Sequence, residues 1–128
     1  MNKLIIDAAN EKIFLTIITS NNIYNITHEN TKINYEKLTI IINDFLLSKS
    51  IKIEEINAIY INQGSGSFAG IRNSMSVVKA FNIAKNIDYY CYNLPDFKDE
   101  KNLSYENIPN LCKKYKIKKN LINPIYIS

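Results

Sequence analysis

The chain has 128 residues, of which 46% are hydrophobic and 22% charged, and its formal net charge at pH 7 is +4. This length fits one domain, and a chain of this size buries roughly two-thirds of its unfolded-state surface, so it has room for a real core. The composition is that of a soluble globular protein without a membrane span, and the modest positive charge permits nucleic-acid contact without requiring it.

Few residues are available for metal or thiol chemistry. The chain has two cysteines, Cys91 and Cys112, and a single histidine, His28, and their spacing matches no metal site. Two buried thiols in a reducing compartment are favoured over a disulfide. Polar residues such as Asp7 and Glu11 interrupt the N-terminal apolar run, which argues against a signal peptide and favours a cytoplasmic protein.

The first part of the chain predicts three strands and a helix. Runs rich in β-branched residues at 3–7, 12–19 and 23–28 are separated by turn residues, and this spacing favours an antiparallel meander. Asn34 is the expected N-cap of a helix over residues 35–49. Its apolar residues recur at helical spacing on one face, at Leu38, Ile41, Ile42, Phe45 and Leu46.

The second part predicts a strand at 56–61, a helix at 70–84 and a strand at 87–92. The loop at 62–72 holds all three glycines and the only arginine. Glycines gathered in this way indicate a sharp turn or a backbone packed so closely that a Cβ would not fit. Beyond it we expect an irregular linker at 93–104, a short helix at 105–115, and an extended apolar segment at 121–127 docked on the body.

This order of elements, β-β-β-α-β-α-β, predicts an α/β fold with a five-stranded mixed sheet and helices packed on it. It resembles one lobe of the actin-like, sugar-kinase-like ATPases, a ribonuclease H-like arrangement. In those enzymes the first hairpin holds phosphate, an acid at the end of the first strand helps to bind the metal, and a second lobe completes the adenosine pocket.

The glycine-rich loop carries a more specific resemblance. Residues 64–72 read Gly-Ser-Gly-Ser-Phe-Ala-Gly-Ile-Arg and resemble the Gly-Pro-Gly-Ser-Phe-Thr-Gly-Leu/Val-Arg signature of the TsaB (YeaZ) family, partner proteins for threonylcarbamoylation of adenosine in bacterial tRNA. Segments 5–9, 35–38, 56–59 and 124–127 are similar to other family stretches. Ser65, Ala69 and Ser128 depart from the family's proline, threonine and terminal arginine. The signature residues are Gly64, Ser65, Gly66, Ser67, Phe68, Gly70 and Arg72.

The resemblance covers residues 1–94 well and 121–128 thinly. It implies a TsaB-like lobe at 1–94, a linker at 95–104 in place of most of the second lobe, and a C-terminal segment at 105–128 that docks back on the lobe.

The residues themselves argue against catalysis. The predicted hairpin, residues 7–10, has no glycine or hydroxyl to let backbone amides approach a phosphate. The loop lacks the Lys-Ser/Thr of a P-loop, and Gly66 stands where a nucleophile elbow needs serine. We therefore expect no catalytic residue, no cofactor and no metal.

Ordinary roles account for several of the polar residues. Asp7 is expected to cap a turn, and the hydroxyls of Ser65 and Ser67 to cap a turn or helix. Arg72 either binds an anion or a partner carboxylate, or pins the start of the second helix. A group of lysines near the C-terminus favours a solvated face over contacts with tRNA phosphates, and comprises Lys113, Lys114, Lys116, Lys118 and Lys119.

The second helix has an apolar zone wider than the roughly 100° stripe that a helix on a sheet needs. Either its own core covers this zone or a partner covers part of it. In the TsaB family the two lobe helices pack against those of TsaD, the catalytic subunit, or against a second TsaB. The resemblance thus implies an interface of Leu38, Ile41, Ile42, Phe45, Ser74, Met75, Val77, Val78 and Phe81.

The resemblance implies a non-catalytic scaffold that binds and stabilises a TsaD homologue in the tRNA threonylcarbamoyladenosine complex. A TsaE homologue is a further candidate partner, and contact with tRNA is expected to be indirect or weak. The alternatives are a homodimer through the same helices, a self-associating structural module, and a residual ATPase or peptidase-like enzyme.

Overall fold

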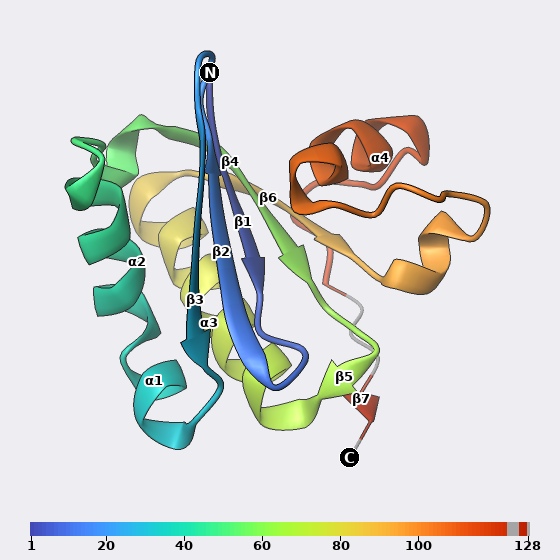
Figure 1. The fold of residues 1–128 in the computed structure, drawn as a ribbon, viewed down its shortest axis with the longest axis horizontal. Coiled ribbons are helices and arrows are strands. Elements are labelled where there is room, and N and C mark those ends of the chain that lie inside the picture. Colours follow the sequence, from blue (N-terminus) through green and yellow to red (C-terminus); the bar gives the residue numbers. More distant parts are fainter. Residues whose placement is uncertain (123–125, 128) are drawn as a thin grey trace.

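The computed structural model describes residues 1–122, 126 and 127, and is built around a twisted five-stranded sheet with helices on both faces (Figure 1). The strand order is β3-β2-β1-β4-β6. The first three strands pair antiparallel, whereas β4 pairs parallel with both β1 and β6, so the expected meander and mixed sheet are confirmed. The strands are β1 (Asn2–Asp7), β2 (Lys12–Ile18), β3 (Ile23–Glu29), β4 (Ile56–Asn62) and β6 (Asp88–Tyr92).

Four α-helices flank the sheet among the described residues. Figure 1 shows α2 and α3 on one side of the sheet and α4 on the other. The helices are α1 (Lys32–Glu36), α2 (Leu38–Ser48), α3 (Phe68–Lys85) and α4 (Ile108–Lys114). None of the helices in the described part of the chain combines the length and apolarity needed to cross a bilayer.

Side chains along the central strands alternate between two buried layers. On β1, Leu4 and Ile6 enter a large cluster with α2 and α3, while Ile5 enters a smaller cluster with α4. On β4, Ile59 belongs to the large cluster and Tyr60 to the smaller one. Because both faces are covered, β1 and β4 read as continuous apolar runs instead of alternating apolar and polar residues.

The single helix predicted over residues 35–49 is in fact two helices. Lys37 has φ −99° and ψ 14°, which interrupts the helical path between α1 and α2. The predicted N-cap is also wrong. Thr31 caps α1 by accepting a 3.3 Å hydrogen bond from the amide of Asn34, and the Asn34 side chain donates to the carbonyl of Glu29 at 2.8 Å.

The helix after the glycine-rich loop begins at Phe68, two residues earlier than predicted. Ser67 is its N-cap, and its Oγ accepts a 3.3 Å hydrogen bond from the amide of Gly70, as expected for a capping hydroxyl. The helix ends at Lys85, and its C-cap Asn86 takes the left-handed conformation at φ 55°.

The chain after β6 builds the smaller layer. The segment predicted to be an irregular linker contains a 3₁₀ turn, Leu94–Phe97, and Phe97 is buried against the ring of Tyr92 at a centroid distance of 5.8 Å. The predicted short helix is present as a 3₁₀ turn, Tyr105–Asn107, followed by α4.

A second, two-stranded sheet lies at the edge of the molecule. Strand β5 (Gly66–Ser67) pairs parallel with β7 (Tyr126–Ile127). The end of the segment predicted to be extended thus lies beside the glycine-rich loop. Residues 123–125 and 128, which include part of the closing family-like stretch, lie outside the described residues.

Candidate functional site

A polar cluster lies where the parallel strands β1 and β4 end. Asp7 closes β1 and is 3% exposed. Its Oδ1 accepts hydrogen bonds from the amide of Ala9 at 3.1 Å and from Nδ2 of Asn62 at 3.2 Å, and its Oδ2 accepts one from the hydroxyl of Tyr105 at 2.8 Å. Asp7 is therefore the turn-capping acid that was expected, and both of its oxygens are bonded by groups of this chain.

Tyr105 comes from the C-terminal layer and covers this cluster. Its ring lies 5.4 Å from the ring of Phe14 on β2. Burial and the neighbouring Asp7 raise the pKa of Tyr105, so its hydroxyl stays protonated and acts as a donor. In the part of the chain that the structure describes, no three His, Cys, Asp or Glu side chains gather closely enough to hold a metal ion.

The glycine-rich loop packs directly on the turn that follows β1. A Cβ on Gly66 would lie 2.3 Å from the carbonyl oxygen of Ala9, and one on Gly70 would lie 2.0 Å from that of Ala8. The amide of Ser67 also donates a 2.8 Å hydrogen bond to the Ala9 carbonyl. The interpretation of the glycines as a closely packed backbone is confirmed.

The remaining signature residues are divided between the interior and the surface. Gly64 is buried, and its amide donates to Oδ1 of Asn62 at 3.0 Å. Ser65 is half-buried and forms no side-chain hydrogen bond with a described residue, so the capping role expected for it stays a prediction. Arg72 is exposed, lies 5.6 Å from the ring centroid of Phe68, and forms no ion pair within the described residues.

Most of the nine residues assigned to a partner interface lie inside this chain's own core. Ile41 and Val77 are half-buried. The other seven are buried, namely Leu38, Ile42, Phe45, Ser74, Met75, Val78 and Phe81. The wide apolar zone of the second helix is thus explained largely by the larger core cluster, and the surface that stays open on this side is made by Val77, by Phe81 and by neighbours of the other interface residues.

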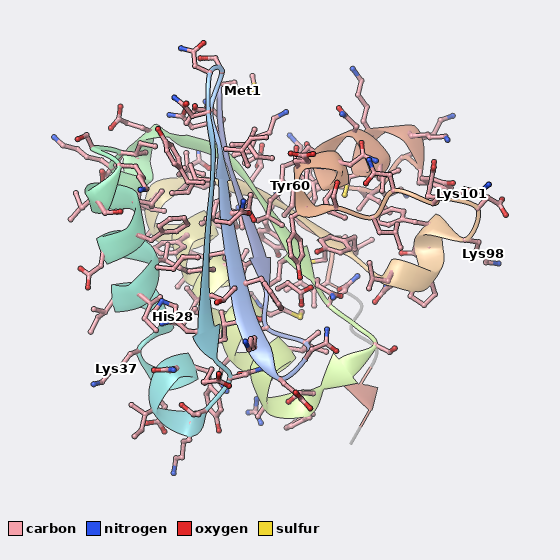
Figure 2. All side chains as sticks on the ribbon, in the orientation of Figure 1. Met1, His28, Lys37, Tyr60, Lys98 and Lys101 are labelled. Carbon is pink, nitrogen blue, oxygen red and sulfur yellow. The ribbon has the colours of Figure 1, made fainter. Side chains whose placement is uncertain are left out.

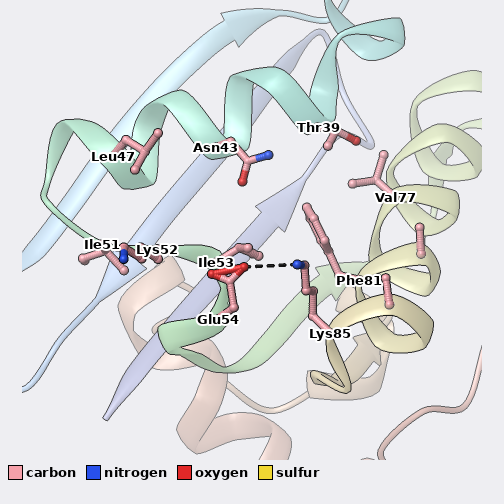
Figure 3. A pocket seen from close by; sticks show the side chains of 12 residues that line it. Thr39, Asn43, Leu47, Ile51, Lys52, Ile53, Glu54, Val77, Phe81 and Lys85 are labelled. Atoms are coloured by element: carbon pink, nitrogen blue, oxygen red, sulfur yellow. Dashed lines mark ion pairs between the residues drawn. The ribbon is translucent and has the colours of Figure 1, made fainter.

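A groove of about 600 Å³ lies between α2 and α3 (Figure 3). Thr39, Asn43 and Leu47 follow one another along α2 at four-residue spacing and face α3. An ion pair between Lys85 Nζ and Glu54 Oε1, at 3.2 Å, joins α3 to the segment before β4. The α3 wall consists of Val77, Ala80, Phe81, Ala84 and Lys85.

This side of the molecule also exposes large apolar side chains. Leu47 in the groove is 60% exposed, and Ile83 on α3 is 76% exposed. Ala80 and Ala84 are small, so another helix could approach the α3 backbone closely. An apolar groove with apolar side chains around it is typical of a protein–protein contact surface.

Comparison with known proteins identifies the fold. No protein-family model and no curated protein matches the chain. Among solved structures, YeaZ from Pseudomonas aeruginosa matches with a TM-score of 0.66 at 17% sequence identity, over 72% of this chain and 43% of the YeaZ chain. A second structure, an uncharacterized protein with similarity to peptidase YEAZ from Pseudomonas aeruginosa, gives the same values.

A more distant match extends over nearly the whole chain. RuvC from Thermus thermophilus, in complex with a Holliday junction substrate, has a TM-score of 0.56 at 10% identity, over 96% of this chain and 83% of RuvC. The chain therefore has a YeaZ-like, ribonuclease H-like α/β fold; the order of elements predicted the ribonuclease H-like arrangement, and the glycine-rich signature predicted the likeness to YeaZ. The match to YeaZ spans less than half of that protein's length.

Proposed function

We propose that this chain is a scaffold protein of tRNA threonylcarbamoyladenosine synthesis that binds a homologue of TsaD through the outer face of α2 and α3. The observation that carries the proposal is the apolar groove between these two helices in a YeaZ-like fold. The glycine-rich signature at 64–72 also supports the proposal. The loop packs closely on the turn after β1, so its glycines have a structural role that requires no bound substrate.

The proposal includes the absence of catalysis by this chain. Asp7 is buried and accepts hydrogen bonds on both oxygens from the chain itself. The thiols of Cys91 and Cys112 are buried, and burial raises the pKa of each to about 12, so neither is an available nucleophile at neutral pH. ATP, metal and the transferred group would then belong to the partner proteins.

The test is co-expression with the TsaD homologue of the same organism, followed by size-exclusion chromatography. Leu47→Arg and Ala80→Arg place a charge in the groove at positions that are not buried, so we expect the fold to persist and co-elution to be lost. Leu103→Arg is the matched control, because Leu103 is 39% exposed and does not line the groove.

The outcomes separate the alternatives. Co-elution that survives both groove variants would exclude this surface, and a failure to co-elute at all would exclude the partner. A tight homodimer that loses its affinity in the same two variants, and that TsaD does not disrupt, would favour the self-associating module. ATP-dependent thermal stabilisation or turnover by the isolated chain would favour the residual enzyme.

A further inference from the structure

A second cavity, of about 430 Å³, opens between α4 and the sheet, on the opposite face from α2 and α3. The sheet contributes Lys3 from β1, Tyr60 from β4 and Tyr90 from β6, all on the face that carries the smaller core cluster. Figure 2 shows Tyr60 on this side, next to α4. The helix and the residues after it contribute Pro109, Asn110, Cys112, Lys113, Lys116 and Ile117.

The lining of this cavity is cationic. Lys3, Lys113 and Lys116 line it, and no Asp or Glu does. These three lysines form no ion pair with a described residue, whereas their neighbours Lys114 and Lys119 are paired with Glu100 and Asp88. Within the C-terminal lysine group, Lys114 and Lys119 are thus paired with carboxylates of this chain, whereas Lys113 and Lys116 line the cavity without an ion pair to a described residue.

The floor of the cavity holds an unused hydrogen-bond donor. Tyr60 is 8% exposed, and its ring stacks on that of Tyr90 at a centroid distance of 5.0 Å and an interplanar angle of 12°. The hydroxyl of Tyr60 forms no hydrogen bond with a described residue, and it is not one of the fully buried unpaired side-chain atoms, so it is accessible to a ligand in the cavity. Burial raises the pKa of Tyr60 to about 12, so the hydroxyl remains a donor at neutral pH.

We propose that this cavity binds a nucleotide phosphate, either in a free nucleotide or in a single-stranded nucleic acid. Lys3, Lys113 and Lys116 supply the positive charge, and the hydroxyl of Tyr60 donates to a phosphate oxygen. The volume exceeds the need of a bare phosphate ion, and Tyr90, Pro109 and Ile117 offer aromatic and apolar contacts to a sugar or base. Lysines combined with aromatic rings are the recognition chemistry of single strands. The inference does not depend on the proposed partner.

The experiment uses the full chain and three probes: inorganic phosphate, adenosine 5′-monophosphate, and a short fluorescein-labelled uridine oligonucleotide. Binding is measured by amide chemical shifts for the first two and by fluorescence anisotropy for the third. The test variants are the double variant Lys113→Glu/Lys116→Glu, whose sites are exposed, and Tyr60→Phe. The matched control is Lys37→Glu/Lys79→Glu, which makes the same charge change at exposed positions that line no described cavity.

We expect the Lys113/Lys116 double variant to weaken nucleotide binding by about tenfold or more, and Tyr60→Phe to weaken it by about threefold to tenfold. For the oligonucleotide, the dependence of log K on log salt should fall by about 0.7 for each phosphate contact removed. The control double variant should change affinity by less than about threefold, because distant exposed charges are screened.

Each outcome decides the proposal. Binding of the mononucleotide with this variant pattern supports a free nucleotide, and binding of the oligonucleotide alone with the same pattern supports a strand. The proposal is overturned if neither nucleotide binds, if the control double variant weakens binding as much as the cavity variant, or if inorganic phosphate binds as tightly as the mononucleotide.

Discussion

The hydroxyl of Tyr105 donates a 2.8 Å hydrogen bond to Oδ2 of Asp7, across 98 positions of sequence. The bond joins the layer built after β6 to the end of the first strand. Asp7 also accepts from Asn62 and from the amide of Ala9, so one buried carboxyl group connects three distant parts of the chain. The end of β1 is therefore a structural junction.

Removing this bond should destabilise the protein measurably. Tyr105→Phe leaves Oδ2 of the buried Asp7 without that donor, and we expect the free energy of unfolding to fall by about 1–3 kcal/mol. Urea denaturation followed by circular dichroism measures it. Tyr35→Phe is the control, since the half-buried Tyr35 forms no side-chain hydrogen bond with a described residue. If both variants lowered the free energy of unfolding equally, the hydrogen bond from Tyr105 to Asp7 would contribute no stability of its own.

Gly70→Ala should be destabilising although the residue lies in a helix. Replacing glycine by alanine at an exposed helical position usually raises the free energy of unfolding by about 1 kcal/mol. Here the added Cβ would lie 2.0 Å from the carbonyl oxygen of Ala8, so the backbone of the helix or of the turn after β1 must move. We expect the free energy of unfolding to fall by about 1–3 kcal/mol in the same assay. Ser76→Ala, at an exposed position of α3, should stay within about 0.5 kcal/mol of the wild type. A stabilising Gly70→Ala would contradict the packing of the loop on the first turn.

Phe97→Ala tests whether the segment after β6 belongs to the core. Phe97 is 2% exposed and contacts the rings of Tyr92 and Tyr115 at centroid distances of 5.8 and 5.4 Å. Its truncation should cost about 3–5 kcal/mol of unfolding free energy, as for other large buried aromatic side chains. Leu94→Ala, in the same turn but 37% exposed, should cost far less. Similar small losses in both variants would mean that this turn is not packed on the sheet.

Alkaline pH should weaken the fold. Burial raises the pKa of Cys91, Cys112 and Tyr60 to about 12 each, so the folded state holds these protons more tightly than the unfolded chain does. That stabilisation is complete below the unfolded-state pKa values, about 8.5 for cysteine and 10 for tyrosine, and is lost as pH rises toward the folded values. The free energy of unfolding should therefore decline between about pH 9 and 12, and urea denaturation at a series of pH values measures this decline.

Cys91→Ala is the control for the alkaline effect. It removes one of the titrating groups and should make the decline shallower, whatever it does to stability at pH 7. A steeper decline in this variant, or a free energy that rises with pH over this range in the wild type, would contradict the burial of these groups.

The sheet was predictable because its residues follow period-two and apolar-run patterns that depend on local sequence. All five strands agree with their predicted bounds to within one residue at either end, and the glycines of the loop correctly indicated close backbone packing. The break at Lys37 was not predictable in this way, because apolar spacing continues through it and the interruption is one of backbone dihedrals.

The candidate sites depended on long-range contacts, which the sequence shows poorly. Helical spacing correctly placed Val78 and Phe45 on apolar faces, but it could not distinguish a face covered by the chain itself from one left for a partner. Asn62 ends β4 as Asp7 ends β1, and the pairing of adjacent parallel strands could have predicted that the two side chains lie close together. No such signal existed for Tyr105 or for the lysines around Tyr60, because the layer after β6 lacks a strong periodic pattern.

The two unequal clusters on either side of the sheet imply two levels of local stability. The helical part of the smaller layer follows β6, so it can open without separating any pair of strands in the five-stranded sheet. Amide hydrogens of α4 should therefore exchange with solvent through a partial opening, while those of β1 and β4 exchange only when the whole molecule unfolds. The cavity beside Tyr60 lies at the boundary between these two units, where a bound ligand would slow the exchange of α4 first.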